Sequence, residues 1–195
     1  MDIIKLLQQD ENLSDLLCYI CDVEILSEFK SPQDEFGHLA YSITGKTFAK
    51  EGTGSEYILL EDGSVGFWGS EGESGRIADS LYDFFVFMVN CPFWRDYLNA
   101  ASYQNMERLQ SFAKELMEEH RQMVEEDMDM DLDETQKELA EGLSIPLDSN
   151  ISNVLMKFYH SATREPRLIT TYTENDGSTH SNTGSLFESK GIVRF

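Results

Sequence analysis

Aspartates alternate with apolar residues near the middle of the chain, in a spacing that could bind a cation. The run consists of Asp127, Asp129, Asp131 and Asp133, and Glu138 follows eleven residues after its first member. In an EF-hand, carboxylates at loop positions 1, 3, 5 and 12 bind calcium and position 6 is a glycine. Leu132 occupies that sixth position. We therefore predict a solvated acidic connector without a structural metal, with weak binding of divalent ions as the alternative.

A second group with possible chemistry is Cys18-Tyr19-Ile20-Cys21, which has the spacing of zinc and redox sites. Zinc would need two further ligands, and neither a second cysteine pair nor a nearby histidine supplies them. A redox pair normally lies between a strand and a helix start, whereas these cysteines fall inside an apolar helical pattern. We predict two small buried apolar side chains.

Patterns of known catalytic sites are missing from the sequence. The four histidines lie in unlike contexts, and no Gly-x-Ser-x-Gly or His-Glu-x-x-His motif occurs. The glycine-rich segment Gly69–Gly75 contains Glu71 and Glu73 but no lysine, so it is not a phosphate-binding loop. The sequence thus favours a protein that is not an enzyme and needs no cofactor. A metal-dependent enzyme centred on Asp127–Asp133 is the least favoured alternative.

The net charge restricts the possible partners. The chain has 36 acidic residues against 15 lysines and arginines, and the stretch from Glu115 to Glu141 carries −10 of the total −21. Such a charge repels phosphate backbones and anionic membranes, which argues against nucleic acid and membrane partners. It attracts basic proteins through electrostatic steering. Solubility alone is the other explanation of an acidic surface.

Features of the whole chain favour the cytoplasm. Three cysteines suit a reducing compartment better than a disulfide framework. The first ten residues read as a short amphipathic helix rather than a signal peptide. No apolar run approaches the length of a membrane span.

Apolar residues at helical spacing predict helices on both sides of a β-rich region. One helix opens at Ile3, and a second follows a cap at Asn12 or Ser14. Ser80 and Asp83 resemble a capping box for a helix that ends before Pro92. Further helices are predicted from about Tyr103 to Glu126, around Leu139 and Leu143, and after Ser149 or Asn150.

The β-rich region contains apolar segments separated by turn residues. Strands are predicted at Leu39–Ile43, Lys46–Ala49, Tyr57–Glu61, Ser64–Trp68 and Arg76–Ala78, whereas Val23–Phe29 is ambiguous between a strand and a helix end, and Ser31–Gly37 is a loop. Asp62-Gly63 predicts a two-residue hairpin with positive φ at both positions. A late strand or hairpin is predicted around the turn Asp176-Gly177.

This order of elements resembles the SUKH superfamily, which includes cell-wall-assembly regulators and many bacterial immunity proteins. The resemblance is carried by Phe48-Ala49, Gly52-x-Gly54, the strand Tyr57–Leu60, and Ile77-Ala78-Asp79-Ser80 before a Phe-rich helix. We therefore predict one α+β domain over residues 1–195, with a mostly antiparallel sheet covered by helices. It comprises a SUKH-like core (about 29–98), a helical extension (about 99–163) and a late strand or hairpin (about 167–181).

The resemblance also implies a function, namely that of an intracellular immunity protein that binds and occludes a toxin domain without catalysis. Such toxins are commonly nucleases, and a basic nuclease would suit an acidic binder. The candidate contact residues are Glu71, Glu73, Asp127, Asp129, Asp131 and Asp133. The alternative is a non-catalytic regulator or scaffold that docks a cellular protein.

Overall fold

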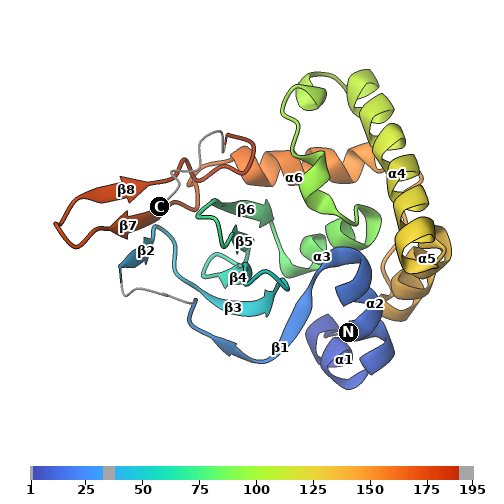
Figure 1. The fold of residues 1–195 in the computed structure, drawn as a ribbon, viewed down its shortest axis with the longest axis horizontal. Coiled ribbons are helices and arrows are strands. Elements are labelled where there is room, and N and C mark those ends of the chain that lie inside the picture. The colour runs from blue at the N-terminus through green and yellow to red at the C-terminus, as the bar shows by residue number, and fades with distance from the viewer. Residues whose placement is uncertain (1, 33–37, 189–195) are drawn as a thin grey trace. The chain divides into compact units, whose positions relative to one another are not determined.

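Helices and two antiparallel sheets make up the described chain, which confirms the predicted α+β class (Figure 1). The computed structural model describes residues 2–32 and 38–188, so most of the loop predicted at Ser31–Gly37 lies outside the described residues. The described chain forms two compact units. Unit 1 comprises Met1–Ile25 and Phe85–Tyr159, and unit 2 comprises Leu26–Phe84 and His160–Phe195. The prediction of a single domain stays a prediction, because compactness does not test whether a part folds alone.

The larger sheet has five strands in the order β1-β3-β4-β5-β6. Its members are β1 (Glu24–Lys30), β3 (Gly45–Lys50), β4 (Glu56–Leu60), β5 (Val65–Trp68) and β6 (Ser74–Ala78). Strands β3 to β6 pair antiparallel with their neighbours in sequence. The predicted strands of this region are therefore confirmed, and the ambiguous segment Val23–Phe29 forms most of β1 rather than the end of a helix.

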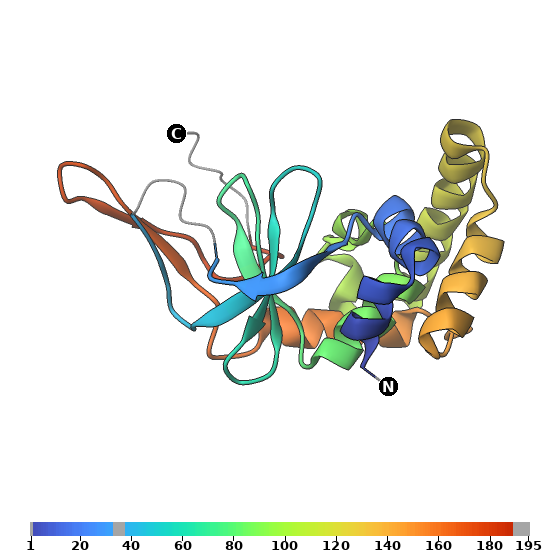
Figure 2. The same cartoon turned by 90° about the horizontal axis from the view of Figure 1, so that it is seen from below.

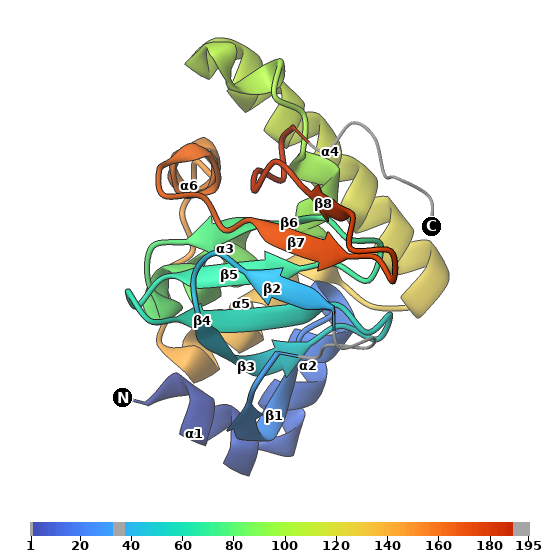
Figure 3. The same cartoon turned by 90° about the vertical axis from the view of Figure 1, so that its left-hand side faces the viewer.

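A second, smaller sheet corrects the prediction of one sheet. It consists of β2 (Leu39–Tyr41), β7 (Thr170–Thr173) and β8 (Thr179–Ser181), in the order β2-β7-β8. Leu39 pairs with Tyr172, and Tyr172 pairs with His180. The late hairpin is thus confirmed. Figure 3 shows β2 and β7 lying over β4 and β5, and Leu168 there packs in one apolar cluster with Ile58 and Leu60.

Hairpin loops of unit 2 share one geometry, which corrects the expected turn at Asp62-Gly63. The amide of Leu60 donates to the carbonyl of Ser64, and the amide of Gly63 donates to the carbonyl of Leu60. Gly63 has a φ of +84°, and Asp62 is not among the residues with positive φ. The hairpin itself is confirmed, but its loop has three residues and ends on a bulge glycine. The same pair of hydrogen bonds closes the loops at 51–55, 69–73 and 174–178.

One face of the larger sheet is packed with aromatic rings. Phe48 on β3, Tyr57 on β4 and Phe67 on β5 are fully buried. Phe84, near the start of α3 (Leu81–Asn90), packs its ring 5.4 Å from Phe48 and 5.1 Å from Tyr57. The predicted cap of α3 is confirmed, since the Asp83 amide donates to Ser80 Oγ at 3.0 Å. The start of α3 therefore covers the sheet with an apolar face, as expected for a sheet covered by helices.

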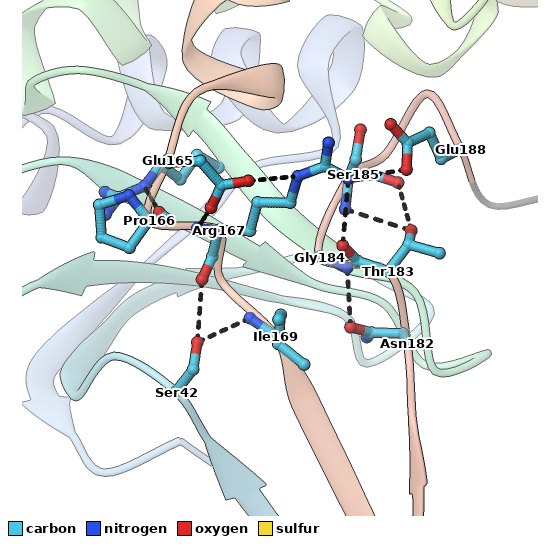
Figure 4. A network of polar contacts seen from close by, with 11 residues as sticks. Ser42, Glu165, Pro166, Arg167, Ile169, Asn182, Thr183, Gly184, Ser185 and Glu188 are labelled. Atoms are coloured by element: carbon cyan, nitrogen blue, oxygen red, sulfur yellow. Dashed lines mark hydrogen bonds and ion pairs between the residues drawn. The ribbon is translucent and has the colours of Figure 1, made fainter.

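Polar contacts attach the segment before β7 to the rest of unit 2 (Figure 4). Ser42 Oγ donates to the carbonyl of Arg167 and accepts from the amide of Ile169. Arg167 forms ion pairs with Glu165 and Glu188, and its Nη1 lies 2.7 Å from Glu188 Oε2. The hydrogen bonds to Ser42 satisfy backbone groups of Arg167 and Ile169, which lie before the paired residues of β7 begin.

Helices make up most of unit 1. They are α1 (Ile3–Gln9), α2 (Glu11–Cys21), most of α3, the 3-10 turns η1 (Trp94–Tyr97) and η2 (Ser102–Gln104), α4 (Met106–Met128), α5 (Leu132–Leu143) and much of α6 (Ser152–Thr163). All the predicted helices are present. The expected caps of α2 were wrong, because the side chain of Asp10 caps it by accepting from the amide of Leu13. Asp10 is also the C-cap residue of α1, so α2 follows α1 directly. Asn12 and Ser14 therefore lie inside α2, where they cannot cap its start.

The core of unit 1 lies where the apolar stripes of these helices meet. Leu17 and Ile20 of α2, Leu109 of α4 and Leu139 of α5 are fully buried. Phe158 of α6 stacks on Phe87 of α3 with ring centroids 4.4 Å apart. Helices α4 and α5 pack against each other (Figure 2), α5 also packs against α2, and α4 also contacts η1 and η2. The faces of α4 and α5 that are turned away from these contacts are exposed.

Candidate protein-binding surface

The exposed faces of α4 and α5 carry a dense group of carboxylates. All twelve acidic residues between Glu115 and Glu141 are exposed. They are Glu115, Glu118, Glu119, Glu125, Glu126, Asp127, Asp129, Asp131, Asp133, Glu134, Glu138 and Glu141. We call this set the acidic surface. Exposed carboxylates keep their hydration and so cost little to present, while their summed field extends over roughly a Debye length, about 8 Å at physiological salt.

The alternating aspartates form the turn between α4 and α5 rather than an ion-binding loop. Asp127 lies in the last turn of α4, and Asp129 ends that helix with a φ of +53°. Asp131 caps α5, because its Oδ1 accepts from the amide of Glu134 at 3.0 Å. The carboxylates therefore serve separate positions along two helices. Among residues 2–32 and 38–188, no cluster of three or more His, Cys, Asp or Glu side chains is arranged to bind a metal ion.

One aspartate of the run is engaged across the helix pair. Arg121 Nε donates to both carboxylate oxygens of Asp133, at 2.9 and 3.1 Å, and its Nη1 lies 3.3 Å from Glu118. The hydrogen bonds that Arg121 donates to Asp133 raise the pKa of the Arg121 guanidinium, which stays charged in any case. Such an exposed pair contributes roughly 0.2–1 kcal/mol. Asp133 thus links α5 to α4 and is less available to a partner than Asp127 or Asp129.

The other two predicted contact residues belong to unit 2. Glu71 is exposed in the loop between β5 and β6. Glu73 is half-buried, and its carboxylate folds over Gly69, where an added Cβ would lie 2.0 Å from Glu73 Oε1. The glycine-rich segment Gly69–Gly75 is a loop only up to Glu73, since β6 begins at Ser74. Glu71 therefore remains a candidate contact, whereas Glu73 has a packing role at the base of the loop.

The cysteines take positions that the sequence only partly predicted. Cys21 is buried as expected, and its Sγ donates to the carbonyl of Met88 at 3.3 Å. Burial raises the pKa of the Cys21 thiol well above its ordinary value, so the nucleophilic thiolate is disfavoured. Cys18 is exposed, which corrects the prediction of two buried side chains. Helical geometry explains the difference. Residues three apart on a helix point in directions about 60° apart, so at the edge of an apolar stripe one can face the core while the other faces solvent.

A hollow of about 620 Å³ lies beside the acidic surface, between the start of α2 and α5. Its rim includes Asp10, Glu134, Glu138 and Glu141. Asn12 Nδ2 donates to Glu138 at 2.9 Å and fixes that side chain at the rim. The helices approach closely here, since a Cβ on Gly142 would lie 2.4 Å from the side chain of Leu13. This hollow extends the acidic surface toward α2.

A cleft of about 400 Å³ opens on the other side of α5, among α4, α5 and residues 147–152. Its apolar lining comes from Ala113, Met117, Leu147 and Ile151. Lys114 and Arg121 line it from α4, together with the amides Gln110 and Gln136. Asp133 belongs both to this cleft and to the acidic surface.

Buried amides hold the walls of the cleft in place. Asn90 Nδ2 donates to the carbonyls of Val86 and Pro146, and Asn90 Oδ1 accepts from the amide of Asp148 at 2.7 Å. Gln136 Nε2 donates to the carbonyl of Val89 at 2.8 Å. The loop at 146–148 and helix α5 are thereby both bonded to the end of α3. Fixed walls of this kind favour recognition because little conformational entropy is lost on binding.

Sequence reasoning missed the cleft, although one signal for it was present. Gln110, Lys114, Met117 and Arg121 recur at i, i+4, i+7 and i+11, so they share one face of α4. This helix was predicted from its apolar residues alone, so the shared face of these four residues was overlooked. No local pattern marked residues 147–152, because their place depends on Asn90, more than fifty residues earlier in the chain.

Among the helices that the structure describes, none combines the length and the apolar composition needed to cross a bilayer. Comparison with protein-family models, with curated proteins and with solved structures finds no match to the chain.

Proposed function

We propose that this chain is an intracellular immunity protein that binds a basic toxin domain, most simply a nuclease, and blocks it by occlusion. The observation that carries the proposal is the acidic surface, in which all twelve carboxylates between Glu115 and Glu141, on two packed helices and the turn between them, are exposed. The SUKH resemblance supports the same function. In this mechanism, the carboxylates steer the basic face of the toxin into contact, and the bound chain then covers that face without any chemical step.

Electrostatic steering predicts a specific effect on the association rate. Complementary charges raise the association rate at low salt, and screening removes this gain as salt increases. Dissociation depends mainly on the close contacts formed afterwards. Loss of charge from the acidic surface should therefore slow association much more than it speeds dissociation.

The structure identifies suitable positions for the test. Glu126 and Asp127 are exposed in the last turn of α4, where a cation is favourable to the helix dipole. Their replacement by lysine should leave the free energy of unfolding unchanged or slightly higher. Asp131 and Asp133 are poor choices, because Asp131 caps α5 and Asp133 pairs with Arg121. Asp15, exposed on α2, provides a control for a charge reversal outside the acidic surface.

The experiment starts with co-purification from the native host, together with the toxin gene expected beside the gene for this chain. Association rates are then measured against salt for wild type, E126K/D127K and a D15K control. We expect the double variant to associate about tenfold more slowly at low salt and to differ less at high salt. An unchanged rate at low salt would remove the acidic surface from the interface. If the partner is a cellular protein that is not a toxin, the chain acts as a regulator or scaffold instead.

A further inference from the structure

The cleft between α4, α5 and residues 147–152 has a lining that differs from its surroundings. Its buried lining is mixed, because Ala113 (2% exposed) and Met117 (9% exposed) are apolar, whereas Asn90, Gln136 and Ser152 are buried polar residues. Leu147 extends this apolar lining outward and is itself 46% exposed. A partner's side chain that entered this cleft would remove water from both its apolar lining and Leu147.

Charge decides which kind of side chain fits. Lys114 lines the cleft from α4 next to Arg121, whose guanidinium is already paired with Asp133. A lysine or arginine inserted beside Lys114 would therefore meet a like charge, and the Asp133 carboxylate is already engaged. An aromatic ring has no such penalty, because cations are attracted to its face and the sulfur of Met117 also makes favourable contacts with rings. The lining amides of Gln110 and Gln136 can pack against a ring and bond to a polar tip.

Carboxylates both line the cleft and surround it. Asp133 and Asp148 belong to its lining, and the rest of the acidic surface continues along α4 and α5. Residues next to an inserted ring would therefore be drawn to these carboxylates if they were lysine or arginine. The cleft is also wide enough, because about 400 Å³ falls within the range of sites that enclose ligands larger than one side chain.

We propose that this cleft binds an aromatic side chain flanked by basic residues, presented by the partner that the acidic surface attracts. The inference rests on the proposed function for the identity of that partner. In this arrangement the carboxylates govern the association rate, and the ring in the cleft governs the lifetime of the complex.

The test uses a synthetic probe, the tripeptide Lys-Trp-Lys, titrated into the full chain labelled with ¹⁵N. The side-chain amides of Gln110, Gln136 and Asn150 line the cleft and report occupancy directly. We expect saturable shifts of these signals with a Kd on the order of millimolar, the range of such small ligands. Glu-Trp-Glu should bind more weakly because of its charge, and Lys-Gly-Lys should leave the amide signals of the cleft unmoved.

Matched variants separate the cleft from its surroundings. Leu147→Ser should weaken binding of Lys-Trp-Lys about tenfold by removing buried apolar contact. Met106→Ser is the control, because Met106 is 41% exposed on α4 but does not line the cleft. Equal binding of Lys-Gly-Lys or of Glu-Trp-Glu, or an unchanged affinity in Leu147→Ser, would overturn the inference. None of these outcomes affects the proposed function, which is decided by the salt dependence of E126K/D127K with the toxin.

Discussion

Asp62 and Arg76 form an ion pair between an exposed loop and a buried strand, with Oδ2 of the aspartate 2.8 Å from Nη2 of the arginine. The side chain of Arg76 is 1% exposed, whereas that of Asp62 is 40% exposed. Arg76 Nε also donates to the carbonyl of Pro166 at 2.9 Å. A buried cation therefore depends on a carboxylate that water can reach, and it connects the β4–β5 loop to the segment before β7.

This pair predicts a pH-dependent stability. Partial burial opposes ionisation of Asp62, but hydrogen bonds from Arg76 and Ser64 and the charge of Arg76 outweigh it and hold the pKa of Asp62 well below its usual 3.8. A group with a lowered folded-state pKa contributes stability that is present above its unfolded pKa and is lost as the pH falls. Asp62→Asn should cost about 1–2 kcal/mol at neutral pH, less than a fully buried pair because of solvent exposure.

The measurement is urea unfolding of wild type and Asp62→Asn from pH 7 down to pH 2. The difference between the two proteins should be constant above about pH 4 and should shrink below it, as the wild-type carboxylate is protonated. Asp176→Asn is the matched control, because Asp176 makes the same bonds to Ser178 in an equivalent loop but lies against no buried arginine. A difference independent of pH would contradict the role assigned to the charge of Asp62.

Asp131 provides a prediction about helix capping. Removal of its side chain in Asp131→Ala leaves the amide of Glu134 without its acceptor and should lower the free energy of unfolding by about 1 kcal/mol. Asp131→Asn keeps an acceptor at the same place and should stay close to wild type. Chemical denaturation of both variants distinguishes the cap from a simple effect of charge, under which the two would change alike.

Gly45 is predicted to tolerate no side chain. A Cβ at this position would lie 2.6 Å from the carbonyl oxygen of Leu59 and 3.0 Å from Cα of Leu60, both on the paired strand β4. Backbone atoms in a ladder cannot move away independently, so Gly45→Ala should cost about 1–3 kcal/mol. Lys46→Ala, at the exposed neighbouring position, should stay within about 0.5 kcal/mol of wild type in thermal unfolding. Equal effects of the two changes would contradict the close approach.

Metal removal should have no effect on folding. We expect the same thermal midpoint with and without a chelator, since neither Cys18 and Cys21 nor Asp127–Asp133 needs an ion to hold its geometry. A structural metal contributes directly to the free energy of folding. A drop of many degrees on chelation would therefore show that the interpretation of these residues is wrong. Addition of calcium tests the weaker alternative, because a bound ion would raise the midpoint.

Local patterns predicted the fold well wherever partners are close in sequence. The strands of the β4–β5 hairpin were located from two apolar segments and the Asp62-Gly63 turn between them. The pattern could not distinguish a two-residue from a three-residue loop, because both place a glycine with positive φ between apolar strands. The second sheet was missed, since nothing near Leu39 in the sequence indicates that its partner is Tyr172.

The candidate surface was predicted by composition but not in its details. A run as acidic as Glu115–Glu141 can hardly be buried, and its exposure follows from the cost of desolvating charge. The separate uses of Asp129, Asp131 and Asp133 as helix end, cap and ion pair depend on where two helices begin and end. Helix boundaries are uncertain by a few residues in sequence reasoning, which is enough to exchange such roles.

The repeated three-residue loops have a consequence for the order in which the chain folds. Strands β3 to β6 each close only a short length of chain, so their pairing costs little chain entropy. Strand β2 can meet β7 only after a loop of about 130 residues is closed, and that entropic cost grows with loop length. We therefore expect amides of β3–β6 to gain protection from hydrogen exchange before those of β2 and β7, as pulse labelling during refolding would show. Simultaneous protection would mean that helix packing, rather than loop closure, limits the assembly of both sheets.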